Sequence, residues 1–147
     1  LVITLYCDIR FMADGARLTT AFARRGLIAE HGIAWMLPRL IGPMHALDLL
    51  YSARLVEARE VESMGLVRML PAEGFQQAVQ ARAAEIANLS SPRSTSIIKR
   101  QVYDSLFQSL AEATQIANRE QDRCRGRTRR RRSFRGRRLR RGRVHAA

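Results

Sequence analysis

The segment from Cys7 to Gly42 reads CDIRFMADGARLTTAFARRGLIAEHGIAWMLPRLIG and carries the strongest local signals of the 147-residue chain. Its mostly apolar run Ile9–Ala13 predicts a buried β-strand. Asp14-Gly15 predicts a turn in which the glycine takes a positive φ, and the Thr-containing run Arg17–Phe22 predicts a second extended piece. Together these signals predict two short strands joined by a turn.

Helices dominate the remainder of the chain. In Gly32–Leu40 apolar residues recur at spacings of three and four, which predicts a helix. Gly42-Pro43 ends that helix and starts another, because proline suits the first position of a helix. The further predicted elements are a helix over Pro43–Ser52, a helix over Glu57–Met64, a strand over Leu66–Leu70, a helix over Phe75–Leu89, and a helix over Pro92–Phe107 that continues or restarts to Asn118. The predicted fold class is α/β.

The order of these pieces resembles the crotonase family, the enoyl-CoA hydratase/isomerase superfamily. The motifs that carry the resemblance are Cys7-Asp8-Ile9-Arg10, Asp14-Gly15-Ala16-Arg17, Arg25-Gly26-Leu27-Ile28, Leu37-Pro38-Arg39-Leu40-Ile41-Gly42, Ala46–Leu50 and Met64–Val67. The resemblance covers residues 1–118 and corresponds to the C-terminal half of a family domain. It implies a partial crotonase-type ββα spiral followed by C-terminal helices.

The resemblance also implies a chemistry. Family members bind acyl-CoA thioesters, and two backbone N–H groups stabilise the thioester oxygen as it becomes enolate-like. The family places both donors ahead of the part that this sequence matches. Hydratases add two glutamates as general base and acid, and those positions fall on Val2 and Phe22, which transfer no proton. We therefore expect a truncated enoyl-CoA hydratase-like protein, a lyase relative that is inactive alone, although another crotonase-type reaction stays open.

Five other residues are candidates for the site. In one interpretation, Glu30 or His31 is a displaced catalytic acid or base. In the interpretation that we favour, the Glu30 carboxylate stabilises the N-terminus of the following helix through the helix dipole. Arg24 and Arg25 contact a CoA phosphate in one interpretation and form a solvated surface in the favoured one. Trp35 lines an acyl pocket or, as we favour, packs in the core from an apolar helix face.

The net charge of +13 is confined to the C-terminus. Residues 1–122 hold 13 basic and 13 acidic side chains, whereas residues 123–147 hold 13 arginines and no acid. We therefore divide the chain into a partial crotonase-like domain, 1–118, and a disordered arginine-rich tail, 119–147. The tail either binds nucleic acid through Arg123–Arg143 or is an out-of-frame translation of GC-rich DNA. We favour the second hypothesis because the resemblance ends near the change of composition.

The cysteines, the apolar runs and the start of the chain bear on metals, membranes and protein partners. Cys7 and Cys124 form no CxxC pair, and no metal site or resident cofactor is expected, which fits reduced thiols in the cytoplasm. No apolar run is long enough to span a membrane. The chain starts with Leu1 inside an apolar run, so we expect a missing N-terminal part or a non-standard start. The expected partners are a second copy, a crotonase paralogue that completes the fold and, in such a complex, acyl-CoA.

Overall fold

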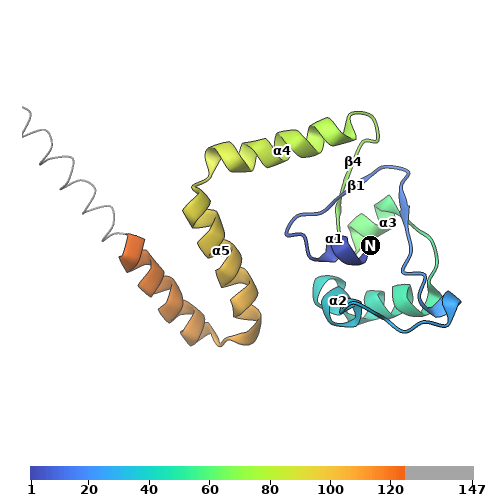
Figure 1. Ribbon diagram of the computed structural model, residues 1–147, viewed down its shortest axis with the longest axis horizontal. Helices are drawn as coiled ribbons and strands as arrows, with labels where there is room; N and C mark the ends of the chain where they lie inside the picture. Colours follow the sequence, from blue (N-terminus) through green and yellow to red (C-terminus); the bar gives the residue numbers. More distant parts are fainter. Residues whose placement is uncertain (125–147) are drawn as a thin grey trace, which may run out of the picture. The chain divides into compact units, whose positions relative to one another are not determined.

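The structure is a computed structural model, and it describes residues 1–124. The chain divides into two compact units, Leu1–Glu85 and a second unit that begins at Ile86. The first unit contains, in chain order, α1 (Val2–Leu5), β1 (Phe11–Ala13), β2 (Arg17–Leu18), η1 (Ala23–Arg25), α2 (Ile33–Ser52), β3 (Val56–Glu57), α3 (Ala58–Ser63), β4 (Arg68–Leu70) and most of α4 (Phe75–Leu89) (Figure 1). This mixed architecture is mostly helical and confirms the predicted α/β class.

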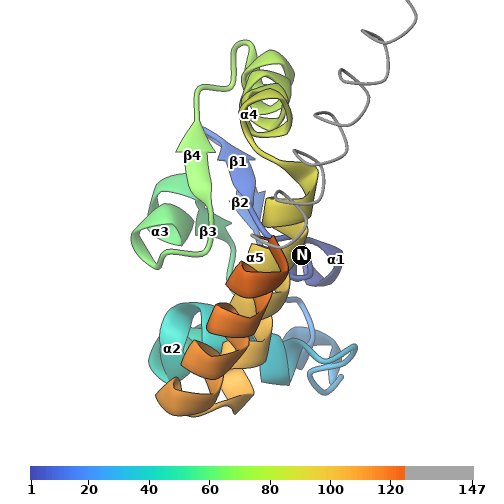
Figure 2. The ribbon, with the colours of Figure 1, turned by 90° about the vertical axis from the view of Figure 1, so that its left-hand side faces the viewer.

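Two short sheets tie distant parts of the first unit together. The strands β1 and β4 pair in parallel, in the register Phe11 with Arg68, Met12 with Met69 and Ala13 with Leu70, and they lie side by side in Figure 2. The strands β2 and β3 pair antiparallel, with Leu18 opposite Val56. A parallel pair needs a crossover connection, and here the chain passes through α2 and α3 between β1 and β4.

The helix α2 is two helices joined at a kink. Gly42 has φ 76° and ψ 161°, which lies outside the helical region, and Pro43 follows it. A residue with a side chain strongly disfavours this φ, and proline is well placed at the first position of the second helix. The kink confirms the predicted break at Gly42-Pro43, although the ribbon runs on through it in Figure 1.

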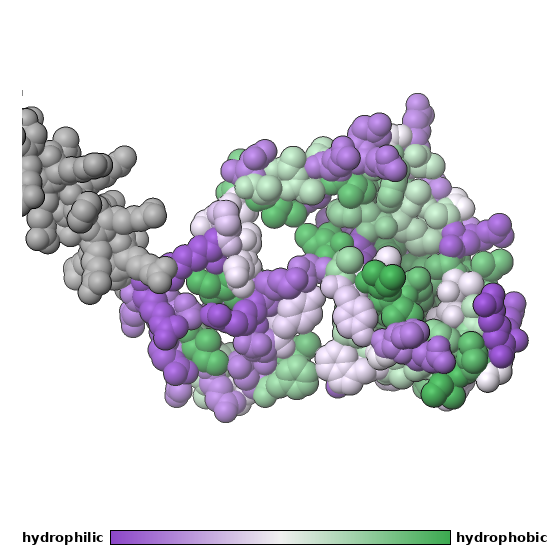
Figure 3. Space-filling model, in the orientation of Figure 1, coloured by the Kyte–Doolittle hydropathy of each residue, from purple (hydrophilic) through white to green (hydrophobic). Residues whose placement is uncertain are grey.

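The core of the first unit lies against α2. Its first half buries every fourth residue, Ile33, Leu37 and Ile41, and its second half buries Ala46 and Leu49. The other buried apolar residues are Leu5 of α1, Ala53, Val56, Ala58, Val61 and Leu66. This pattern is typical of an amphipathic helix that covers a small sheet and a neighbouring helix. Figure 3 shows apolar side chains at the surface. The exposed large side chains of the first unit include Ile3, Ile28, Met44 and Tyr51.

The second unit is built from helices. It contains α5 (Pro92–Asp104), the 3₁₀ turn η2 (Ser105–Phe107) and a helical stretch over residues 110–124. Ser91 caps α5 by accepting the Ser94 N–H, as the Ser91-Pro92 sequence suggests. The predicted helix over Pro92–Phe107 therefore tightens at its end and restarts at residue 110. The helical stretch passes residue 118, and the predicted boundary between residues 118 and 119 stays a prediction.

Candidate functional site

The two positions that the resemblance aligns with the hydratase glutamates are apolar and packed. Val2 in α1 and Phe22, just before η1, are both partly buried against the core cluster. The helix α1 and the turn η1 each contact α2, so the two positions lie on segments held by the same helix. Neither side chain can accept or donate a proton, so any proton transfer here has to use another group.

The nearest carboxylate to the start of α2 belongs to Glu30. Its Oε2 lies 3.7 Å from Nε2 of His31, and the two side chains are 43% and 73% exposed. The Tyr6 hydroxyl donates to the His31 carbonyl oxygen at 2.8 Å, which ties α1 to this turn. Gly32 occupies the N-cap of α2 without a side-chain capping bond, so the Glu30 carboxylate acts on the helix only through its charge. Glu30 is thus an accessible carboxylate with an ionisable neighbour, and Tyr6 is a positioning residue that the sequence did not reveal.

Trp35 does not pack in the core, so that expectation was wrong. Its side chain is 44% exposed, and the guanidinium of Arg39 lies over the indole, 3.9 Å from the ring centroid. Arg39 also donates to the Trp35 carbonyl oxygen at 2.8 Å. The spacing of four residues places both side chains on one face of α2, with His31 one turn earlier. The structure therefore brings Trp35 toward the Glu30 end of α2, on its outer surface.

The two arginines of η1 differ. Arg24 donates from Nε to the carbonyl oxygen of Ser52 at 3.0 Å, at the C-terminal end of α2. The hydroxyls of Thr19 and Thr20 donate to the carbonyl oxygens of Ala53 and Leu49, at 2.9 and 2.8 Å. These donors supply the last turn of α2 with hydrogen bonds that a helix end lacks. Arg24 therefore has a structural contact beyond the predicted solvated surface, whereas Arg25 is exposed as expected.

An ionic network joins the end of α2 to α3. Arg54 donates to the carboxylates of Asp48, at 2.8 Å, and Glu60, at 2.9 Å. Hydrogen bonding from Arg54 lowers the pKa of the Glu60 carboxyl, and the bonds to Glu60 and Asp48 raise the pKa of Arg54 further above its usual range. The network fixes the connection between α2 and β3. Their roles are structural.

The described residues offer no alternative centre of metal chemistry. Within residues 1–124, no group of three or more His, Cys, Asp or Glu side chains could hold a metal ion. Cys7 and Cys124 form no disulfide within the described residues, and Arg93 donates to the Cys124 sulfur at 2.9 Å. Across the same residues, every helix is too short or too polar to cross a membrane.

Comparison with known proteins identifies the family. The family model described as "Enoyl-CoA hydratase/isomerase" matches residues 1–136. "Probable enoyl-CoA hydratase EchA12" of Mycobacterium tuberculosis is 36% identical over 115 residues, which are 77% of this chain and 40% of that protein. The "Putative enoyl-CoA hydratase" of Thermus thermophilus is 35% identical over 99 residues, 66% of this chain and 38% of that protein.

Solved structures agree with the sequence matches. The enoyl-CoA hydratase EchA12_1 from Mycobacterium marinum is 47% identical, with a TM-score of 0.62, over 71% of this chain and 53% of that chain. An enoyl-CoA hydratase/isomerase from Mycobacterium abscessus, titled "probable", is 30% identical, with a TM-score of 0.80, over 85% of this chain and 51% of that chain. The chain thus spans about half the length of these relatives or less. It belongs to the enoyl-CoA hydratase/isomerase family, the crotonase superfamily.

Proposed function

We propose that this chain provides one part of an acyl-CoA-processing site and is inactive alone. Two observations together support the proposal. The chain belongs to the family, and the positions that the resemblance aligns with the family's two glutamates hold the apolar residues Val2 and Phe22. The second clause rests on the same two positions, because neither side chain can accept or donate a proton. The resemblance places the oxyanion donors ahead of the matched part. A longer crotonase-family chain would supply those donors.

We further propose that Glu30 moves the proton in the completed site. Its carboxylate is accessible and lies just before the start of α2, and a carboxylate is a common general base. A single carboxylate can remove a proton from the carbon beside a thioester carbonyl and return it to another carbon. Hydration uses two such groups in this family. The residues therefore favour a double-bond isomerisation over the addition of water.

We propose that the other candidate residues contact the substrate or position Glu30. Trp35 and Arg25 are exposed and are available to an acyl or phosphate group of the substrate. Tyr6 holds the backbone of His31 and so positions the Glu30 turn. We place the protein in the cytoplasm, on the basis of the enzyme family and of two cysteines that form no disulfide within the described residues.

The test uses the full chain, alone and co-expressed with a longer crotonase-family protein from the same source. We expect no consumption of a short enoyl-CoA thioester by the chain alone, and consumption or isomerisation by the co-purified complex. Glu30→Gln should abolish that activity, while Glu73→Gln, an exposed carboxylate in the turn before α4, should not. Turnover by the chain alone, or full activity of the Glu30→Gln complex, would contradict the proposal.

The second candidate function is nucleic-acid binding through Arg123–Arg143. Of the arginines in this range the structure describes Arg123, whose guanidinium pairs with Glu120 at 3.0 Å. Residues 125–147 lie outside the described part, so both the nucleic-acid prediction and the prediction of an out-of-frame tail fall on residues that the structure does not describe. The concentration of 13 arginines in the last 25 residues supports the candidate. A gel shift that weakens steeply with salt and disappears on deletion of residues 125–147 would support it. The nucleotide sequence of the locus decides whether the tail is in frame.

A further inference from the structure

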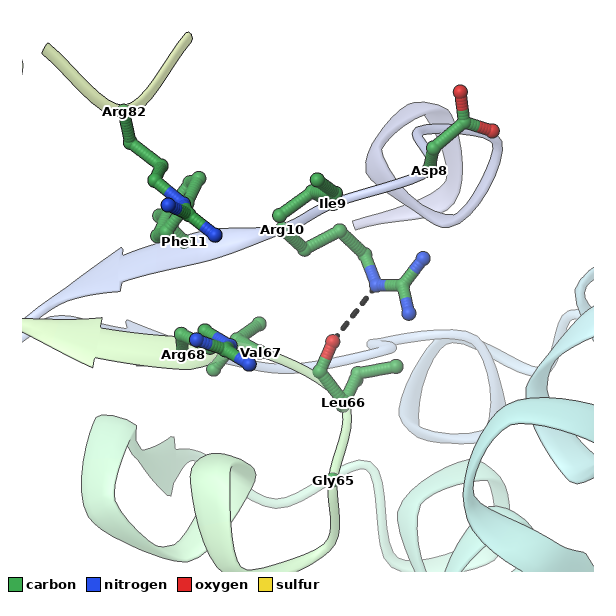
Figure 4. Close-up of a pocket in the computed structure, with 9 residues that line it drawn as sticks. All are labelled: Asp8, Ile9, Arg10, Phe11, Gly65, Leu66, Val67, Arg68 and Arg82. Carbon is green, nitrogen blue, oxygen red and sulfur yellow. Dashed lines mark hydrogen bonds between the residues drawn. The ribbon is translucent and has the colours of Figure 1, made fainter. Parts of the chain in front are cut away.

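A cavity of about 250 Å³ lies in the first unit, away from the Glu30 end of α2. Residues 8–11, which lead into β1, form one wall, and residues 65–68, which lead into β4, form the second. Arg82 of α4 closes it from a third side, and Figure 4 shows this side chain extending from α4 toward Phe11. Three separate elements of one unit therefore converge on the cavity.

Strand register places the cavity on the outer face of the β1–β4 pair. Phe11 pairs with Arg68, and paired residues project to the same side of a sheet. Met12, the next residue, projects to the opposite side and packs against the core cluster. Phe11 and Arg68 consequently face away from the core, on the side where Arg82 lies. Figure 4 shows the Phe11 side chain beside the guanidinium of Arg82.

The lining is basic. Arg10, Arg68 and Arg82 carry three positive charges, against one negative charge on Asp8. Arg10 is held in place by backbone carbonyls alone in its described bonds, to Leu66 at 2.7 Å and Cys7 at 2.7 Å, so these bonds leave its charge uncompensated (Figure 4). Figure 4 shows the Arg10 guanidinium directed toward Leu66 and away from those of Arg68 and Arg82, so Arg68 and Arg82 are the two arginines on the outer face.

The two other arginines are available to a ligand. Arg68 is an exposed residue of β4. Arg82 pairs with Glu85 on the same helix, but both side chains are about half exposed, and an exposed ion pair of this kind is weak and easily exchanged. Each guanidinium can offer two parallel N–H groups to an oxyanion. Neither side chain is needed to complete the core.

We propose that this cavity binds a phosphate or pyrophosphate group through Arg68 and Arg82, with Arg10 providing a fixed positive charge behind them. A phosphate group carries several acceptor oxygens, so it can accept hydrogen bonds from two guanidinium groups at once. A cavity of about 250 Å³ has room for this group but not for a whole coenzyme molecule. The phosphate can belong to a small inorganic anion or to the end of a larger phosphorylated ligand that extends outside.

The test is a ¹H–¹⁵N NMR titration of the full chain with inorganic pyrophosphate at constant ionic strength. We expect saturable shifts of the amides of residues 8–11 and 65–68. Arg68→Gln and Arg82→Gln should each weaken binding at these amides about tenfold, as expected for the loss of a charge-assisted hydrogen bond. The matched control is Arg59→Gln, an exposed arginine of α3 outside the cavity, which should leave the affinity unchanged. Residue-resolved shifts separate this site from phosphate binding by the arginine tail.

A second arm replaces pyrophosphate with coenzyme A. Saturation of the same amides at a lower coenzyme A concentration would assign the site to a phosphate of the coenzyme, and saturation by pyrophosphate alone would assign it to a small anion; both results support the proposal. Shifts confined to residues 123–147, equal affinity in the Arg68→Gln and Arg82→Gln variants, or undispersed amide signals for residues 8–11 and 65–68 would each overturn it. The titration needs no turnover, so its outcome is independent of the proposed acyl-CoA activity.

Discussion

Replacing Thr20 with valine probes how the chain after β2 holds the end of α2. The Thr20 hydroxyl donates to the Leu49 carbonyl oxygen at 2.8 Å, and the residue is buried. Valine has nearly the same shape and removes only the donor. The Leu49 carbonyl also accepts the Ala53 N–H at 3.1 Å, so the substitution does not leave it unpaired. The expected loss is therefore that of a typical intramolecular hydrogen bond, about 1 kcal/mol, rather than that of an orphaned buried group.

The assay is urea unfolding followed by fluorescence. Trp35 is the one tryptophan of the sequence, and it lies on α2, so its emission reports on the helix that Thr20 holds. For a slope of about 1–3 kcal/mol per molar urea, a loss of about 1 kcal/mol lowers the midpoint by roughly 0.3–1 M. Thr114→Val is the matched control, because it removes an exposed hydroxyl that donates to the Leu110 carbonyl oxygen at 2.7 Å. We expect the control to shift stability by less than about 0.5 kcal/mol.

Two results would refute this reasoning. A Thr20→Val midpoint equal to or above that of the unmodified chain would mean that the hydrogen bond does not hold α2. A loss above about 3 kcal/mol would mean that the Leu49 carbonyl depends on Thr20 alone, against the second bond from Ala53.

Three further predictions concern other parts of the chain. Leu37→Ala, at a fully buried position, should destabilise the first unit by about 2–5 kcal/mol in the same urea assay. Gly32→Ala should also destabilise it, because φ is +74° and a Cβ would lie 2.9 Å from the Tyr6 hydroxyl; adding Tyr6→Phe should restore part of the stability. Hydrogen bonds from the Ser109 N–H and hydroxyl lower the pKa of the Glu112 carboxyl. The ionised Glu112 therefore stabilises the helical stretch 110–124 at any pH above the pKa that this carboxyl has in the unfolded chain. Helicity, followed by circular dichroism, should fall as the pH drops through the lower pKa of the folded state. Glu112→Gln should remove this pH dependence.

Local sequence signals located the helices well. The helix over Phe75–Leu89 begins and ends where the apolar period and its flanking turns predicted. Gly42-Pro43 and Ser91-Pro92 marked a kink and a helix start because glycine and proline act on the backbone of their immediate neighbours. These features need no information from distant residues, so a single sequence contains them.

Spacing alone did not reveal which face of α2 is covered. Apolar residues stand on several sides of its second half, and the structure buries Ala46 and Leu49 while Leu47 and Tyr51 remain exposed. Trp35 shares this ambiguity, since its spacing fits the apolar face but its ring lies under Arg39. The covered face depends on segments far along the chain, and a helical period contains nothing about them.

Hydrogen bonds between residues far apart in the sequence hold the two ends of α2, and the sequence did not reveal them. These bonds link the stability of α2 to the proposed function of Glu30. Tyr6 holds the carbonyl of His31 across 25 residues, at the start of α2, and Thr20 holds Leu49 across 29 residues, at its end. Glu30 immediately precedes the first contact, and Phe22 closely follows Thr20 in sequence. Because the two ends of α2 are held by the segments that contain Val2 and Phe22, loosening either end should displace Glu30 relative to these two residues. We therefore expect Tyr6→Phe to lower the activity of the completed complex more than Thr114→Val does, even where the two variants are equally stable.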